Sequence, residues 1–247
     1  MAAGRSNHHA GPLVRAIDPW GHSDPSTGGF RQLLSEEQRS RLNTIATIVR
    51  FRKGETIYSH GEAVKMIYNV IDGVVKACKI GPGGAKHIVS FLYPGDIIGL
   101  SEEGRYVNSA SALTPVTAYS LPLSALLRSL PRDGELEFQV IAKLCHELRE
   151  NQRHALLLAQ QPALARLAMF LRLQEHIQSA AGRPAGEIDL PMSRTDIADF
   201  VGLSLAAVSR GFRSLLSCGI VSIKNRRDVK IVDRKAFEAL AGNVELL

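Results

Sequence analysis

The chain has few cysteines and lacks any long apolar run. Only three cysteines, Cys78, Cys145 and Cys218, occur among its 247 residues, and none lies in a CxxC pair. This spacing argues against a disulfide framework or a zinc knuckle and favours a reducing compartment. No stretch of about 18 apolar residues is present, and the N-terminal residues lack the apolar core of a secretory signal. We therefore expect a cytoplasmic protein that does not contact the membrane.

Motifs that carry catalysis are also missing from the sequence. There is no nucleophile paired with a base, no glycine-rich phosphate loop ending in Lys-Ser/Thr, and no convincing pair of carboxylates. We therefore expect a protein that is not an enzyme.

Positive charge is what the chain has in excess. The formal net charge is +6, and the segment from Arg210 to Lys235 holds eight Lys and Arg residues against two acids, Asp228 and Asp233. A concentration of positive charge near one end of the chain favours a polyanionic partner there.

Three regions with different hydrophobic periodicity follow one another. Residues 47–122 contain short runs rich in Val, Ile and Tyr, separated by glycine-containing turns, which predicts a β-roll or jelly-roll. Residues 135–159 have no Gly or Pro and predict one long helix. After Pro162, a further helix and a Gly/Pro-rich link lead to a second domain. The predicted fold class is α+β, with a flexible arm (residues 1–29), a β-roll domain (30–134), a dimerisation helix (135–160) and a winged helix-turn-helix domain (161–247).

The predicted long helix carries an apolar residue every seven positions. Such a seam predicts a parallel two-stranded coiled coil and hence a homodimer, although a helix packed on its own domain remains an alternative. The seam consists of Ile141, Leu144, Leu148, Asn151, Ala155 and Leu158.

The C-terminal region has the pattern of a winged helix-turn-helix. Ser193, three residues before Asp196, predicts a capped helix start, Gly202 supplies a sharp turn, and Ser204 caps a second helix that begins near Leu205. The residues expected to face the core from this second helix are Val208, Phe212, Leu215 and Leu216. Two predicted strands, 220–223 and 229–232, flank a basic turn and form the wing.

The second helix of such a motif lies in the DNA major groove. Arg210 would then project away from the core toward a guanine, with Ser209 beside it, and Leu205 and Ala206 would lie at the front of the helix near base edges. A surface salt bridge of Arg210 is the alternative. The residues predicted to contact phosphates are Ser193, Arg194, Ser204, Arg213, Lys224, Arg226 and Arg227.

The order of these three regions, together with three short segments, resembles the Crp/Fnr family of bacterial transcription regulators. The segments are GDIIGL (95–100), MSRTDIADFVGLS (192–204) and VSRGF (208–212), and the resemblance covers residues 30–242. It implies a cyclic-nucleotide-binding-like β-roll and a homodimer that binds double-stranded palindromic DNA, contacts RNA polymerase and acts, in the favoured interpretation, as an activator.

The sequence departs from two branches of that family. Cyclic-nucleotide-binding members carry a Glu and an Arg where this chain has Leu100 and Asn108, so no cyclic-AMP response is expected, even though Arg105 lies nearby. No cysteine precedes Cys78, so the ligands of an N-terminal iron–sulfur cluster are missing. The remaining resemblance is to the FixK-like branch, which implies an oxygen-, nitrogen-oxide- or stress-responsive network.

A third departure concerns the DNA target. Many family members have Glu at the position of Ala206, where it accepts a hydrogen bond from cytosine. Alanine offers only a methyl group, which suits contact with a thymine methyl. The target should therefore keep the guanine contacted by Arg210 and have an altered or relaxed preference beside it.

Two alternatives give the β-roll a ligand of its own. The first is a haem- or small-ligand-gated sensor in which His60, His87 or Cys78 binds haem, and the second is a cupin-like metal-binding protein. The leading interpretation has no cofactor and no metal.

Overall fold

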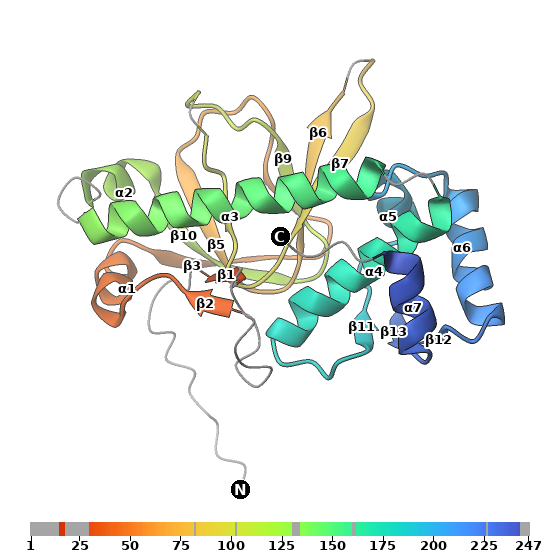
Figure 1. The fold of residues 1–247 in the computed structure, drawn as a ribbon. Helices are drawn as coiled ribbons and strands as arrows, with labels where there is room; N and C mark the ends of the chain where they lie inside the picture. Colours follow the sequence, from red (N-terminus) through yellow and green to blue (C-terminus); the bar gives the residue numbers. More distant parts are fainter. Residues whose placement is uncertain are drawn as a thin grey trace, which may run out of the picture. The chain divides into compact units, whose positions relative to one another are not determined.

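The computed structural model describes residues 15–17, 30–81, 83–101, 103–129, 134–159, 162–225 and 227–242. They divide into two compact units (Figure 1). The first contains Gln32–Lys79 and Phe91–Lys143, and the second contains Ile80–Ser90 and the chain from Leu144 onward. The expected arm at residues 1–29 lies outside the described residues except for strand β1 (Arg15–Ile17), which pairs with β2 (Phe30–Gln32). The division into four segments stays a prediction.

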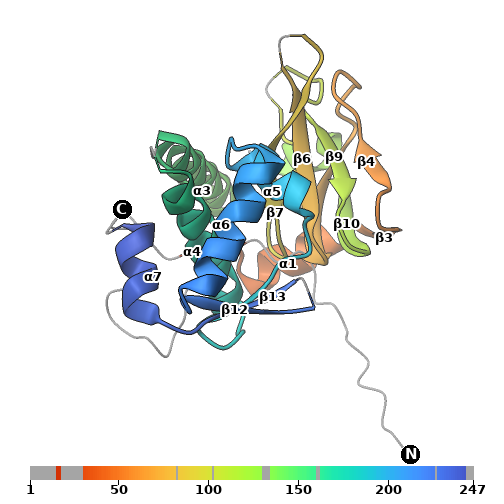
Figure 2. The same cartoon turned by 90° about the vertical axis from the view of Figure 1, so that its right-hand side faces the viewer.

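Antiparallel sheets of short strands make up the β-roll, which confirms the predicted fold class (Figure 2). One four-stranded sheet has the order β3 (Thr47–Phe51), β10 (Val116–Pro122), β5 (Met66–Asp72), β8 (Ile97–Ile98). The other has the order β4 (Thr56–Tyr58), β9 (Ser109–Ala112), β6 (Val75–Ile80), β7 (Lys86–Leu92). Strand β10 is central in the first sheet, since it pairs antiparallel with β3 on one side and β5 on the other.

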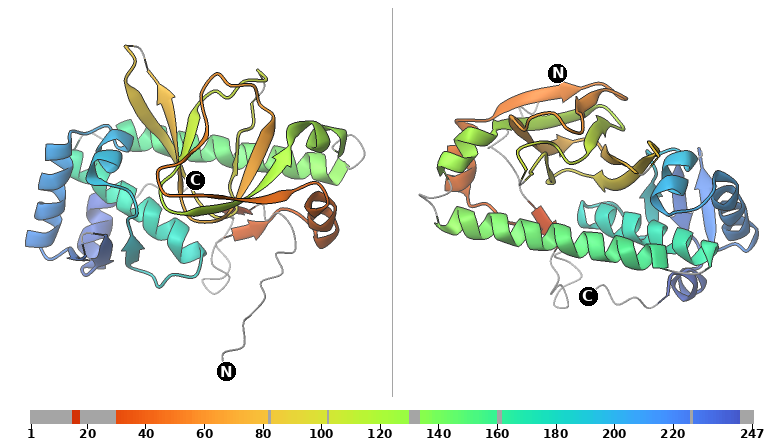
Figure 3. Two further views of the ribbon diagram at one scale, coloured as in Figure 1. Left: turned by 180° about the vertical axis from the view of Figure 1, so that it is seen from behind. Right: turned by 90° about the horizontal axis from the view of Figure 1, so that it is seen from above.

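Helices cover one face of the first sheet. Helix α1 (Glu36–Asn43) starts at Ser35 with a reciprocal capping box to Gln38, and α2 (Leu123–Ser129) follows β10 directly. Figure 3 shows both helices beside the N-terminal end of α3 (Gly134–Ala159). Their apolar side chains form one buried cluster with the sheet, which includes Leu42, Ile67, Leu121, Leu126 and Leu136. Burial of this cluster is what holds the first turns of α3 on the β-roll.

A buried ion pair joins α3 to the turn before β8. The Lys143 side chain is 2% exposed, and its Nζ lies 2.9 Å from Asp96 Oδ1. The other carboxylate oxygen of Asp96 accepts a hydrogen bond from the Tyr93 amide at 2.8 Å. A buried ammonium needs such a partner, so the pair fixes where α3 crosses this turn.

The second unit is a winged helix-turn-helix built on helix α4 (Ala163–Ala180). Helices α5 (Arg194–Phe200), α6 (Leu205–Ser217) and α7 (Arg234–Ala241) accompany a sheet of order β11 (Glu187–Asp189), β13 (Asp228–Ile231), β12 (Val221–Lys224). Its core side chains are essentially inaccessible and include Leu167, Phe170, Leu171, Ile197, Val208, Leu215 and Phe237. Strands β12 and β13 pair antiparallel, as expected for the wing. The expectation that Leu216 is buried was wrong: it is 41% exposed, because the buried stripe of α6 follows Val208, Phe212 and Leu215.

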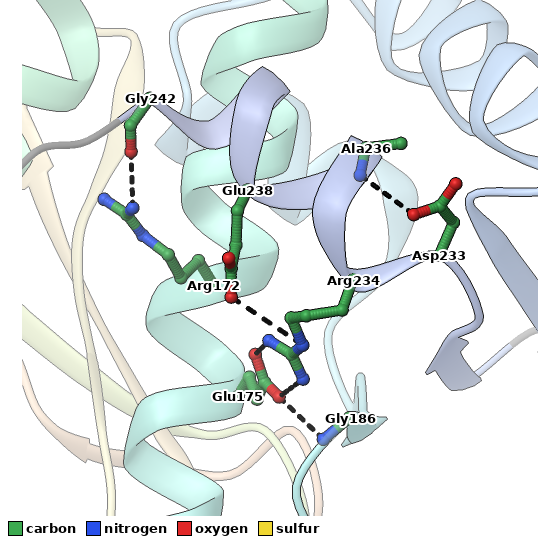
Figure 4. Close-up of polar contacts among 8 residues, drawn as sticks. All are labelled: Arg172, Glu175, Gly186, Asp233, Arg234, Ala236, Glu238 and Gly242. Atoms are coloured by element: carbon green, nitrogen blue, oxygen red, sulfur yellow. Dashed lines mark hydrogen bonds and ion pairs between the residues drawn. The ribbon is translucent and has the colours of Figure 1, made fainter.

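One carboxylate connects three parts of this unit (Figure 4). Glu175 on α4 is 7% exposed, accepts a hydrogen bond from the Gly186 amide at 2.6 Å, and is bound by both terminal nitrogens of Arg234 on α7. Hydrogen bonding to Glu175 raises the pKa of Arg234. Arg172 donates to the Gly242 carbonyl at 2.6 Å and so fastens the end of α7 as well. These contacts set the position of α7 and of the entry to β11 relative to α4.

Replacing Glu175 by Gln should destabilise this unit, because an amide cannot accept both guanidinium nitrogens and the Gly186 amide. We expect a loss of about 1–3 kcal/mol, since Arg234 keeps access to water. Urea unfolding measures the loss. Glu238→Gln is the matched control, because Glu238 is exposed and 3.9 Å from Arg234 Nε, and it should cost less than about 0.5 kcal/mol. Equal losses for the two variants would show that Glu175 has no special role.

Candidate nucleic-acid interface

Helix α5 begins at a side-chain cap. Ser193 Oγ accepts a hydrogen bond from the Asp196 amide at 3.0 Å, and Asp196 Oδ2 accepts one from the Ser193 amide at 2.9 Å. This reciprocal capping box is the one predicted from the sequence. It orients the helix so that Ile197 and Ala198 are buried under α6.

The turn between α5 and α6 depends on Gly202. Its φ is +65°, a conformation that side chains disfavour, and a Cβ there would lie 3.1 Å from Leu158 Cδ2. The Leu203 amide donates to the Ala198 carbonyl at 2.9 Å, and Arg166 Nη1 donates to the Gly202 carbonyl at 3.2 Å. The turn is therefore closed by backbone bonds and held from α4.

Helix α6 has one buried face and one open face. Ser204 Oγ caps it by accepting a hydrogen bond from the Ala207 amide at 3.1 Å. Val208, Phe212 and Leu215 are buried, so Arg210 and Arg213 project the other way and are exposed. A glycine in the middle of this helix also has a packing role, because a Cβ on Gly211 would lie 2.8 Å from Leu167 Cδ2 of α4.

The residues predicted to contact bases lie together at the start of α6. Leu205 is 47% exposed, Ala206 is exposed, and Ser209 is half-buried. Among the described residues, none forms a hydrogen bond or an ion pair with the Arg210 guanidinium. The geometry thus offers no surface salt bridge within the described chain to occupy Arg210.

The predicted phosphate contacts fall into three groups. Arg213, Lys224 and Arg227 are exposed on α6 and the wing, where they can reach a polyanion. Ser193 and Ser204 both serve as helix caps. Arg194 is half-buried with its guanidinium over the Phe212 ring, and Arg226 lies outside the described residues.

All six residues of the predicted dimer seam are exposed on α3. They are Ile141, Leu144, Leu148, Asn151, Ala155 and Leu158. The opposite face of the helix is buried and includes Leu136, Lys143, His146 and Leu157. The exposed face extends beyond the predicted seam to Phe138, which is 61% exposed, and Leu156. Phe138 could have been found from the sequence, since it precedes Ile141 by three residues on the same helix.

A contact between α3 and α5 was not predicted from the sequence. His154 stacks parallel on the Phe200 ring at 4.0 Å between centroids, and its Nε2 lies 2.8 Å from the Phe200 carbonyl oxygen. Nothing in the local pattern around either residue predicts their meeting, because they lie 46 positions apart.

Three tyrosines of the β-roll lie close together beside Asn108, one of the positions where the sequence departs from cyclic-nucleotide-binding members. The rings of Tyr58 and Tyr106 stack at 3.9 Å between centroids, and Tyr68 lies next to Tyr58. Tyr58 donates a hydrogen bond to Asn108 Oδ1 at 2.9 Å, and burial raises its pKa. Arg105 Nη1 donates to the Gly61 carbonyl at 2.7 Å. Arg105, the residue considered as a substitute phosphate ligand, therefore donates to the backbone, and Asn108 is hydrogen-bonded to Tyr58.

A small apolar cavity lies on the other face of strand β5. Its volume is about 50 Å³, and Leu42, Ile67, Leu126 and Leu136 are among its lining residues. Pockets for metabolites measure roughly 300–1,000 Å³, so this one is too small for a nucleotide.

The three alternative haem ligands differ in exposure. His60 and His87 are exposed and Cys78 is half-buried, and within the second unit His87 Nδ1 lies 3.3 Å from Asp199 Oδ1. Among the residues that the structure describes, no three His, Cys, Asp or Glu side chains gather in a way that could hold a metal ion. Over the same residues, no helix has the length and apolar character to cross a membrane.

Comparisons with known proteins agree with this architecture. The family model of the cyclic nucleotide-binding domain matches residues 48–133, and that of the Crp-like helix-turn-helix domain matches residues 165–240. The chain is 31% identical over 234 residues to the nitrogen fixation regulation protein FixK of Bradyrhizobium diazoefficiens, an alignment that covers 93% of this chain and 98% of FixK. The chain belongs to the Crp/Fnr family of transcription regulators.

Two further relatives support the same placement within the Crp/Fnr family. The transcriptional activator protein Anr of Pseudomonas aeruginosa is 30% identical over 212 residues, which cover 85% of this chain and 86% of Anr. The structure of FixK2 from Bradyrhizobium japonicum has a TM-score of 0.74 at 31% identity and covers 80% of this chain and 98% of FixK2. The predicted resemblance to FixK-type Crp/Fnr proteins is confirmed.

The turn glycine offers a direct test of how α6 is held in this Crp/Fnr regulator. Gly202→Ala should cost about 1–2 kcal/mol for the left-handed backbone and about 1 kcal/mol more for displacing Leu158. Gly219→Ala is the matched control, since Gly219 has a φ of +68° and open space around it. Denaturant unfolding of both variants measures the difference. If the two losses were the same, the contact with Leu158 would not constrain the turn.

Proposed function

We propose that this regulator is a homodimer that binds palindromic double-stranded DNA in a sequence-specific manner and activates transcription in the cytoplasm. The observation that carries the proposal is the exposed guanidinium of Arg210, which has no partner among the described residues and lies near the front of a helix-turn-helix second helix. The names of FnrA and Anr, transcriptional activator proteins, support the direction of regulation.

Base contacts follow from the docking of such a helix in the major groove. Arg210 can donate two hydrogen bonds to O6 and N7 of a guanine, which is the commonest specific contact in this groove. Leu205 and Ala206 carry no hydrogen-bonding group and are exposed one turn earlier. They suit contact with a thymine methyl group. The base pair beside the guanine is therefore selected by this apolar contact, or it is selected only weakly.

Affinity that is independent of sequence comes from the exposed cations of α6 and the wing. Arg213, Lys224 and Arg227 lie where they can approach phosphates, and Arg226 adds a charge to the same turn of the sequence. Neutralising phosphates releases counterions, so binding should weaken steeply as the salt concentration rises.

Dimerisation supplies a second copy of α6, which can bind a second half-site of the DNA. The exposed apolar face of α3 is unusual for a helix in water and fits a two-stranded coiled coil. Two copies of α6 related by a two-fold axis would contact half-sites about 34 Å apart, one turn of DNA. The dimer therefore explains why the target would be a palindrome.

The β-roll bears on the signal. The stacked tyrosines and the hydrogen bonds of Asn108 and Arg105 argue against a cyclic nucleotide. The proposed network responds to oxygen, nitrogen oxides or stress, and the regulator contacts RNA polymerase at its promoters. The name of the anaerobic regulatory protein of Haemophilus influenzae supports a response to oxygen. No cofactor is part of the proposal.

Arg210→Ala should remove discrimination at one base pair of each half-site, worth about 1–3 kcal/mol, because the bidentate contact to guanine is lost. The measurement is binding to duplexes selected by the wild-type protein from a random library, with each base pair varied in turn. Arg227→Ala is the control: it should weaken all duplexes alike and reduce the salt dependence of binding. Full discrimination by Arg210→Ala would contradict the proposed base contact.

Leu148→Glu should convert the dimer to a monomer and abolish tight binding to the palindrome, because a carboxylate would be buried in the seam. Sedimentation equilibrium gives the oligomeric state. Leu127→Glu is a matched control, since Leu127 is 54% exposed on α2 and outside the seam, and it should leave the dimer intact. A wild-type protein that sediments as a monomer would refute this part of the proposal.

A further inference from the structure

The two helices of the helix-turn-helix are joined by a cation–π contact. Arg194 is the first residue of α5, and its Cζ lies 3.2 Å from the centroid of the Phe212 ring on α6. Phe212 is 4% exposed and belongs to the buried stripe of α6. The guanidinium therefore lies over a ring that is itself fixed in the core.

Within the part of the chain that the structure describes, no carboxylate forms an ion pair with this guanidinium. Its Nη1 is buried and has no hydrogen-bond acceptor among the residues that the structure describes. Burial lowers the pKa of Arg194 to about 10. The face of an aromatic ring carries negative quadrupole charge and attracts a cation most strongly where water is excluded. The ring thus supplies the attraction that a carboxylate supplies elsewhere in the chain.

The location of the ring bears on base contacts. Phe212 follows Arg210 by two residues, so the two side chains lie on nearly opposite faces of α6. Any rotation of α6 about its axis that moves Arg210 also moves Phe212 against Arg194. Arg213, in contrast, is exposed and makes no such contact with α5.

We propose that Arg194 is a positioning residue that fixes the rotation of α6 through Phe212, and that it is not a phosphate ligand. This positioning role replaces the phosphate contact that the sequence predicted for Arg194. It rests on the proposed binding of α6 to DNA. In this arrangement Arg194 acts on sequence discrimination through the direction of Arg210, whereas exposed cations such as Arg213 act on the electrostatic part of binding.

A double-mutant cycle in the absence of DNA tests the contact itself. Arg194→Met keeps an apolar stem on the ring but removes the charge, and Phe212→Leu keeps apolar volume but removes the ring. Urea unfolding of the two single variants and the double variant should give non-additive losses, with a coupling of about threefold or more in the unfolding equilibrium constant. Additive losses would overturn the proposal whether or not the protein binds DNA.

A second experiment measures DNA binding and distinguishes a positioning role of Arg194 from phosphate binding. Wild-type protein and variants are titrated with a palindromic duplex selected by the wild-type protein, and with a scrambled duplex, over a range of salt concentrations. Arg194→Met and Phe212→Leu should each lower the ratio of selected to scrambled affinity by about three- to thirtyfold. Neither should change the slope of log affinity against log salt.

Arg213→Met is the matched reference for a phosphate contact. Removing one phosphate contact from each subunit of a dimer should lower the salt slope by about two, with selected and scrambled duplexes weakened alike. The same slope change in Arg194→Met, or an unchanged ratio of affinities, would overturn the positioning role. Wild-type protein that fails to prefer any duplex would instead refute the proposed function, which the DNA-free cycle does not test.

Discussion

The close approach of α6 to α4 is the constraint on which the candidate interface depends. Leu167 of α4 is fully buried, and its Cδ2 occupies the space that a side chain on Gly211 would need. A glycine inside a helix costs about 1 kcal/mol relative to alanine, and here that cost is offset by packing at a distance that no other residue permits. Because α6 is pressed onto α4 along one stripe, its exposed side chains have a defined direction. The direction of Arg210 therefore depends on this packing, together with the proposed positioning of Phe212 by Arg194.

In the β-roll, two tyrosine hydroxyl groups find their hydrogen-bond partners within the protein. Asn108, where the sequence departs from the pattern expected of cyclic-nucleotide-binding members, accepts a hydrogen bond from Tyr58. Tyr106 stacks on the same ring and donates to the Met66 carbonyl at 2.6 Å. Both hydroxyl groups are therefore hydrogen-bonded within the protein.

Local patterns predicted the elements well, and tertiary contacts explain the rest. The long helix, the Ser193 cap, the turn at Gly202 and the wing follow from periodicity, capping and turn chemistry, which act within a few residues. The burial of Arg194 could not be predicted in this way, because its partner Phe212 is on another helix and arginine at a helix start is ordinarily exposed. The same holds for the contact of His154 with Phe200 and for the approach of Leu167 to Gly211. Each depends on how helices pack, and a single sequence does not encode that locally.

Helix α3 carries two kinds of face, and their chemistry differs for a physical reason. On the buried side, Lys143 is held by Asp96 and His154 lies on Phe200, so this face includes polar groups with specific partners. On the exposed side, Ile141, Leu144 and Leu148 offer only apolar surface, which has no directional preference beyond shape. Directional contacts fix the helix within its own chain. The apolar seam instead suits pairing with the same seam of a second copy, because its residues recur at a regular spacing. Asn151 is the one polar member of that seam, and an amide facing its symmetry mate is what would hold two such helices in register.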